Sequence, residues 1–257
     1  MPILPLFFNK RKMRGIVGIE AAIVLIAFVI VAAALAFVVL NMGFTTTQKS
    51  KEAMVSGLKE ASTALEVDGS VLAFANESNY ADEIVIPLKT APGRGLVDLS
   101  SARASIIYWT SEYGFQNIYV AYGYIYQDTD GTYNVTLYDG DGSNLGVADT
   151  NKNVLDINAT RVAVRSIIQS SSIGGSGSVP DVYAVVLWVQ SIQSKGSKDF
   201  NLEFGEKAIV LVDIPGSDYR LASYDRFKVE IKPPEGAPLT VERSMPPSID
   251  VGVLDLG

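Results

Sequence analysis

The chain has 257 residues and contains neither cysteine nor histidine, which excludes disulfide bonds, thiolate nucleophiles and imidazole bases or ligands. Its formal net charge of −7 argues against binding nucleic acid, because such binding needs basic residues gathered on one face. The length suffices for a hydrophobic core in one domain beside a long helix.

The N-terminal region combines a basic stretch with an apolar run that follows it directly. The basic residues are Lys10, Arg11, Lys12 and Arg14. Gly15 comes next, and the apolar run from Ile16 to Leu40 contains a single charge, Glu20. A helix needs about 20 apolar residues to span a bilayer, so this run is long enough. The basic end is expected in the cytoplasm, and everything after Leu40 outside the cell.

The position of the cleavage site decides what this segment becomes. A secretory signal is cut after its apolar core, beside small residues. Here the favoured site lies before the core, between Gly15 and Ile16. Such a cut removes the basic stretch, lowers the side-chain charge from −7 to −11, and keeps the apolar helix on the mature chain. An uncleaved membrane anchor is the competing interpretation. A cut after Ala36 is less favoured, because it would expose the apolar residues Phe37–Leu40.

The segment resembles the leader of archaeal flagellins (archaellins) and of their type IV pilin relatives. In those families a prepilin-type peptidase cuts after a glycine that follows basic residues. Gly18 and Glu20 would stand at the third and fifth mature positions, where glycine and a polar or acidic residue are common. The resemblance implies that Glu20 registers an incoming subunit by pairing with a neighbour's new α-amino group. The alternative is a carboxylate favoured by the helix macrodipole.

Helical spacing resumes after the apolar run. The apolar positions are Met54, Val55, Leu58, Ala61, Ala64 and Leu65. They recur at intervals of three and four, with charged residues on the other faces. We therefore predict one helix from Ile16 to about Glu66, within a core segment of residues 16–67. It would be about 75 Å long, far more than the thickness of a bilayer.

Beyond residue 70 the apolar period changes to two. Strands are predicted at Val71–Ala75, Glu83–Leu88, Ala104–Trp109, Ile118–Tyr126, Thr132–Tyr138, Arg161–Ile168, Val182–Ile192, Lys207–Ile214, Phe227–Lys232 and Leu239–Arg243. Turn-rich spacers separate them, including Asp139–Gly146. The fold class is thus α+β: a long hydrophobic helix, then an antiparallel, immunoglobulin-like β-sandwich or barrel over residues 68–257. Val182–Ile192 is apolar on both faces, which favours a central strand.

The C-terminal region predicts a β-hairpin. Phe227, Val229 and Ile231 line one face of a strand, Pro233–Pro238 form a turn, and a second strand follows. Residues 227–243 are also similar to the C-terminal sequence of archaellins. This second resemblance lies at the far end of the chain from the first.

Three N-glycosylation sequons begin at Asn76, Asn134 and Asn158. Archaellins are often N-glycosylated, so the resemblance favours use of at least one. Asn134 lies within a predicted strand, and its side chain must face outward for modification.

Two aspartate-rich segments suggest weak calcium sites. Their carboxylates are Asp128 and Asp130 in the first, and Asp139 and Asp141 in the second. Neither segment completes a twelve-residue calcium loop, because the closing glutamate is absent, and ordinary hairpin turns are favoured.

Tyr122, Tyr124 and Tyr126 alternate on one predicted strand. Core packing or a subunit contact is favoured over a sugar-binding platform. The Gly174–Ser178 loop lacks the residues of a phosphate-binding loop. No pair of carboxylates stands out in the sequence as catalytic. We therefore expect neither an enzyme nor a cofactor.

Taken with the two resemblances, the sequence predicts an archaellin that polymerises into the extracellular swimming filament of an archaeal cell. Its partners would be further copies of itself, the prepilin-type signal peptidase, the motor and membrane platform of the archaellum, and the membrane before assembly. No nucleic-acid partner is expected. The alternatives are an adhesive archaeal type IV pilin and, in another class, a membrane-anchored extracellular binding module.

Overall fold

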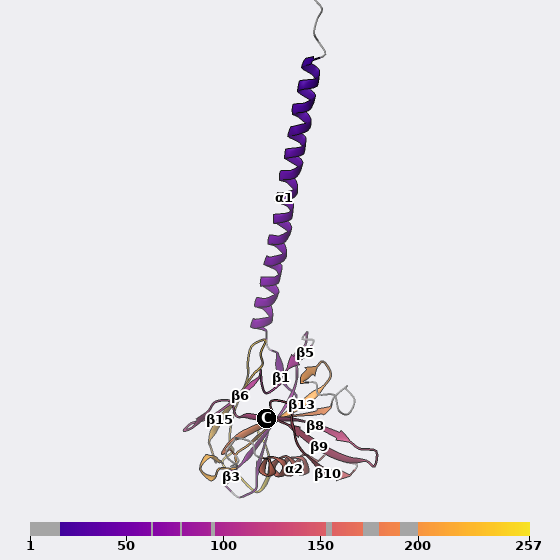
Figure 1. Cartoon of the computed structure of the whole chain (residues 1–257). Coiled ribbons are helices and arrows are strands. Elements are labelled where there is room, and N and C mark those ends of the chain that lie inside the picture. Colours follow the sequence, from indigo (N-terminus) through magenta and orange to yellow (C-terminus); the bar gives the residue numbers. More distant parts are fainter. Residues whose placement is uncertain are drawn as a thin grey trace, which may run out of the picture. The chain divides into compact units, whose positions relative to one another are not determined.

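In the computed structural model (Figure 1), the described residues are 16–62, 64–77, 79–93, 96–152, 156–171, 180–190 and 200–257. The basic leader residues, Gly15 and the Gly174–Ser178 loop lie outside these ranges. The chain forms two compact units, divided between Leu58 and Lys59.

The N-terminal unit is a single helix. Helix α1 extends over Ile16–Ala61, and its first half is apolar on every face. The predicted helix was correct in kind but too long at its C-terminal end, because Leu65–Val67 form strand β1 instead. Leu65 is 1% exposed and pairs with Thr90, so burial in the β unit overrides helical spacing at this point.

The second unit is built around a nine-stranded sheet. Its strands, in spatial order, are β10 (Asn144–Lys152), β9 (Thr132–Tyr138), β8 (Tyr119–Gln127), β11 (Tyr183–Gln190), β13 (Lys207–Asp213), β4 (Glu83–Thr90), β2 (Leu72–Ala75) and β17 (Gly252–Asp255), while β1 also pairs with β4. Strand β11 is central, as its two apolar faces predicted. It pairs in parallel with β8 and antiparallel with β13.

A four-stranded sheet packs against one face of the nine-stranded sheet. Its order is β16 (Leu239–Ser244), β15 (Arg226–Lys232), β6 (Ser105–Thr110) and β7 (Gly114–Phe115). Phe227, Val229 and Ile231 are fully buried and join Val186 and Trp188 of β11 in one hydrophobic core. The predicted hairpin is therefore confirmed as β15–β16, with Ile231 opposite Leu239.

The predicted class, a long apolar helix followed by a mostly antiparallel β domain, is confirmed. The β unit is a sandwich whose larger sheet remains open at β10 and β17, so it is not a closed barrel. The parallel β8–β11 pair and a helix on the outer face distinguish it from an immunoglobulin domain.

That outer helix, α2 (Ile157–Ser170), lies beside β9 and β10 (Figure 1). The strand predicted at Arg161–Ile168 was wrong. Asp156 caps the helix, because its carboxylate accepts a hydrogen bond from the Asn158 backbone N–H at 2.8 Å. The buried positions are Thr160, Arg161, Ala163, Val164, Ile167 and Ile168. This spacing is helical, and Val164, Ile167 and Ile168 pack into a second core against the sheet.

Several short elements were not predicted. They are β3 (Tyr80–Ala81) paired with β14 (Leu221–Ala222), β5 (Leu96–Asp98) paired with β12 (Asn201–Glu203), and the 3-10 turn Ser217–Tyr219. Strand β10 begins within the predicted spacer Asp139–Gly146, and β17 had no predicted counterpart. Such short or polar edge strands lack a two-residue apolar period long enough to detect.

Candidate functional site

The surface of α1 is the largest exposed apolar surface of the described residues. Its exposed large side chains include Ile23, Val24, Leu25, Ile26, Phe28, Val29, Ile30, Val31, Leu35, Phe37, Val38, Val39 and Leu40. From Gly18 to Ala61 the helix is long and apolar enough to cross a membrane, and none of its most apolar window is buried within the chain. A helix that is apolar all round requires lipid or other helices around it.

Gly18 and Glu20 lie in the first two turns of α1. Glu20 is exposed, and a β-carbon added at Gly18 would meet no atom within 4 Å. Both residues are thus accessible at the helix start. Pairing of Glu20 with a neighbouring α-amino group stays a prediction.

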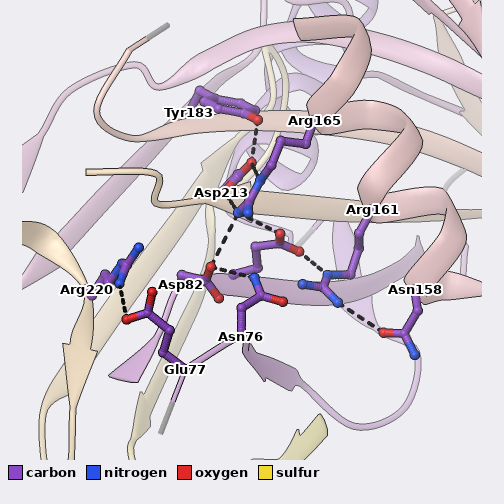
Figure 2. Close-up of polar contacts among 10 residues, drawn as sticks. Asn76, Glu77, Asp82, Asn158, Arg161, Arg165, Tyr183, Asp213 and Arg220 are labelled. Atoms are coloured by element: carbon purple, nitrogen blue, oxygen red, sulfur yellow. Dashed lines mark hydrogen bonds and ion pairs between the residues drawn. The ribbon is translucent and has the colours of Figure 1, made fainter. Parts of the chain in front are cut away.

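A cluster of charged side chains is buried between α2 and the sheet, at the end where β4 begins and β13 ends (Figure 2). Its members are Asp82, Glu83, Arg161, Arg165, Tyr183 and Asp213. Asp82, Glu83 and Asp213 are each at most 5% exposed. Asn76 and Asn158 extend the cluster at its margins (Figure 2).

Arg165 connects three carboxylates. Its Nη2 lies 2.5 Å from Asp213 Oδ1, 2.7 Å from Glu83 Oε1 and 3.5 Å from Asp82 Oδ2. Its Nε donates a second hydrogen bond to Asp213 Oδ2 at 2.9 Å. Since Asp213 stands directly opposite Glu83 in the β13–β4 ladder, the guanidinium offsets the repulsion of two facing carboxylates.

Arg161 completes the cluster from the preceding turn of α2. Its Nε donates to Glu83 Oε2, and its Nη1 donates to Asn158 Oδ1 at 3.0 Å. The guanidinium carbon lies 3.9 Å from the centroid of the Phe74 ring, a cation–π contact. Arg161 and Arg165 are four residues apart, so they project from one face of α2.

The electrostatics of the cluster follow from its burial. Burial raises the pKa of the Glu83 carboxyl, while the hydrogen bond from Arg161 opposes that rise. Burial also raises the pKa of the Tyr183 hydroxyl, and the neighbouring Asp213 carboxylate, which accepts its hydrogen bond, adds to the shift. Every charged side chain here has an opposite charge within reach. The arrangement therefore fixes α2 to the sheet and contains no free nucleophile.

The three sequons differ in accessibility. Asn76 is exposed just after β2, and its Nδ2 donates to Asp82 Oδ2 at 2.6 Å. Asn158 is exposed near the start of α2, but its sequon partner Thr160 is fully buried and donates to the Asp156 carbonyl. Asn134 is only 6% exposed within β9. The outward orientation required at Asn134 is therefore absent, because its side chain lies within the fold, and the prediction of a glycosylation site at Asn134 is wrong for the folded chain.

The aspartate-rich segments form hairpin turns. Asp130 accepts hydrogen bonds from the Thr132 backbone N–H and hydroxyl at 2.9 and 3.0 Å. Asp139 and Asp141 each accept from the Ser143 backbone N–H at 2.9 Å. Burial raises the pKa of the Asp139 carboxyl, and the neighbouring Asp141 side chain adds to the shift. Over the described ranges, no group of three or more acidic side chains could hold a metal ion, and the turn interpretation accounts for Asp128, Asp130, Asp139 and Asp141.

The three alternating tyrosines of β8 differ in burial. Tyr122 is fully buried, while Tyr124 and Tyr126 are partly exposed. Tyr122 stacks on Tyr138 at 5.6 Å between ring centroids and meets Trp188 edge-on at 6.4 Å. Core packing therefore explains Tyr122 without a sugar ligand.

Comparison with known proteins identifies the family. The model of the family described as archaeal-type flagellin matches residues 15–243. The chain belongs to the archaeal-type flagellin family. A probable flagellin of Aeropyrum pernix is 42% identical over 242 residues, covering 94% of this chain and 97% of that protein. A probable flagellin of Archaeoglobus fulgidus is 30% identical over 246 residues, covering 95% of each chain.

Among solved structures, the flagellin FlaB1 of Methanocaldococcus jannaschii aligns with a TM-score of 0.49 at 16% identity, covering 75% of this chain and 95% of that one. Family membership confirms both resemblances found in the sequence. This archaeal-type flagellin is accordingly a structural subunit, as predicted.

The charged cluster of this flagellin was not predicted from the sequence. A usable signal was present: Asp82, Glu83 and Asp213 stand at the ends of otherwise apolar strands, and Arg161 and Arg165 share a helical spacing. Buried charges at such positions require partners of opposite sign.

Proposed function

We propose that this flagellin polymerises through α1 into an extracellular filament used for swimming. The observation that carries the proposal is the apolar, unburied surface of α1. In a polymer, copies of α1 would bury this surface against one another along the filament axis.

The energetics explain why assembly needs other proteins. Burying a large apolar side chain from water stabilises a structure by about 1.5–3 kcal/mol. Before assembly α1 lies in the membrane, where lipid already covers the same side chains. Transfer from lipid to protein gains little of that energy, since lipid tails are as apolar as the side chains. The motor and membrane platform of the archaellum therefore drive extraction, and the chain itself catalyses no reaction.

Processing comes before assembly. A prepilin-type signal peptidase cuts between Gly15 and Ile16 and removes Lys10, Arg11, Lys12 and Arg14. The new α-amino group at Ile16 then lies four residues before Glu20 of its own chain, within reach of Glu20 on an adjacent copy in a bundle. The β unit, residues 59–257, faces outward, and Asn76 is the preferred glycosylation site, with Asn158 second.

N-terminal sequencing of purified filaments tests the processing step. A start at Ile16 is expected, and Gly15→Val should leave the precursor in the membrane and abolish filaments. A conservative variant beside the site, Met13→Leu, keeps the glycine and should be cut normally. Filaments that begin at Met1 would contradict the proposal.

A motility assay separates this role from that of an adhesive pilin. Deletion of the gene is expected to abolish swimming while surface attachment persists. Retained swimming with lost attachment would assign the chain to adhesion instead.

A further inference from the structure

Tyr224 occupies a backbone conformation that tyrosine rarely adopts. Its φ is +68°, in the left-handed region where L side chains other than asparagine and aspartate are uncommon. It is the third residue of the turn Ala222–Asp225, in which the Asp225 N–H donates to the Ala222 carbonyl at 3.2 Å. That position in a type II turn favours glycine. Tyrosine there therefore weakens the fold of the subunit itself.

Within the described residues, no hydrogen bond or ring contact of the Tyr224 side chain itself offsets this strain. The side chain of Tyr224 is 73% exposed. Over the described residues, neither its hydroxyl nor its ring has a hydrogen bond or aromatic partner. Among the described residues, the other left-handed ones that are not glycine are Asn79 and Asn117, a residue type that tolerates this region.

Hydrogen bonds fix the backbone of the turn that carries the exposed ring. The Asp225 carboxylate accepts a hydrogen bond from the Ala222 N–H at 2.7 Å, and the Asp225 carbonyl accepts one from Met245 at 2.8 Å. Tyr80, 45% exposed, stands opposite Ala222 in the β14–β3 ladder, so a second exposed tyrosine lies on the same small sheet. Tyrosine has only two side-chain χ angles, so an exposed tyrosine on a fixed backbone loses little entropy when it is buried against a partner.

We infer that Tyr224 is an anchor of the contact between neighbouring β units in the filament, and that its partner is a second copy of this chain. The inference rests on the proposed polymer. Tyrosine is enriched at protein interfaces, and strain without a local benefit marks a functional position. In a filament built from one kind of chain, the protein that meets every copy of Tyr224 is another copy.

Thiol labelling tests the burial of this position directly. The chain has no cysteine, so Tyr224→Cys introduces a single reactive thiol. The full-length processed chain is labelled with a maleimide in detergent and again as filaments. Labelling at position 224 is expected to slow by about tenfold or more on assembly, as for a residue at the centre of an interface. Equal rates in the two states would overturn the inference.

A second variant, Tyr224→Gly, is expected to raise the thermal stability of the unassembled chain and to lower that of the filament. Tyr224→Gly relieves the backbone strain, so the Tm of the unassembled chain is expected to rise by about 2 °C. Its filaments, lacking the ring, are expected to release subunits at a lower temperature than unchanged filaments. Asn117→Gly, the same backbone change at a residue that already tolerates it, should leave filament release unaltered.

The outcomes separate the two proposals. Tyr224→Gly filaments that are as heat-resistant as unchanged ones, or more so, would overturn the interface role alone. Filaments sheared from native cells that contain none of this chain by mass spectrometry would overturn the polymer and this inference with it.

Discussion

The Arg165 guanidinium and the Asp213 carboxylate form a two-point ion pair, with Nε 2.9 Å from Oδ2 and Nη2 2.5 Å from Oδ1. This pair joins a helix on one face of the nine-stranded sheet to a central strand. Asp213 is 1% exposed and also accepts the hydrogen bond of Tyr183. Its charge is therefore buried, and its stability in the fold depends on Arg165.

Removing this guanidinium is expected to destabilise the β unit strongly. Arg165→Met leaves the carboxylates of Asp213 and Glu83 buried with less compensation, which costs about 3 kcal/mol. Denaturant unfolding of the full-length chain in detergent, followed by the fluorescence of buried Trp188, measures the loss. The matched control is Arg103→Met, whose ion pair with Asp98 is at the surface. The control should change the free energy of unfolding by less than about 1 kcal/mol. Equal effects of the two variants would refute the special role of the cluster.

The Asp68 carboxylate makes the stability of the fold depend on pH in the acid range. The hydrogen bond from Lys207, with Nζ 2.6 Å away, holds the pKa of the Asp68 carboxyl below its usual value of 3.8, and Lys89 at 3.4 Å adds to this. The folded state thus binds fewer protons than the unfolded state just below pH 3.8. The stabilisation is complete above that pH and is lost as the pH falls through the lower, folded pKa.

Asp68→Asn should therefore flatten the decline of Tm with acid below pH 3.8. Lys207→Met removes the main cause of the lowered Asp68 pKa and should flatten the same acid decline of Tm. The measurement is thermal unfolding by circular dichroism from pH 2 to about 6. An unchanged acid slope in Asp68→Asn would show that other carboxylates control it.

Gly123 permits close approach of β8 and β9. A β-carbon at this position would lie 2.4 Å from the Thr136 carbonyl oxygen and 3.1 Å from Leu187 Cδ2. Because the nearest atom is backbone, the strands must shift, and we expect Gly123→Ala to destabilise the chain by about 1–3 kcal/mol. Gly57→Ala, where no atom lies within 4 Å of the added β-carbon, serves as the control and should not destabilise the chain. Thermal unfolding compares the two variants, and similar midpoints would contradict the expectation.

Glycosylation should follow side-chain accessibility. Asn76 is exposed in a loop, whereas Asn134 is 6% exposed in a strand. Mass spectrometry of peptides from native filaments is expected to find glycan on Asn76 and none on Asn134. Asn76→Gln should remove that glycan while filaments still form. A modified Asn134 would mean that the sugar is attached before β9 folds.

Long, regular apolar patterns were readable from the sequence. The 16–40 run specified the helix, the two-sided apolar pattern placed Val182–Ile192 at the sheet centre, and Phe227, Val229 and Ile231 specified the C-terminal hairpin. Short patterns could not be assigned reliably from the sequence. Arg161–Ile168 contains β-branched residues that fit a strand, and the Asp156 cap that made it a helix carries little weight in a single sequence.

The sequence by itself determined the apolar helix and the two family resemblances and predicted a leader before the helix, because these depend only on local composition and order. The tertiary structure decided what depends on contacts between distant segments. It buried Asn134, brought Arg165 of α2 to Glu83 and Asp213 on two strands, and paired β8 with β11 in parallel. It also left Tyr224 strained and exposed, since a turn's φ angles follow from the strands it joins.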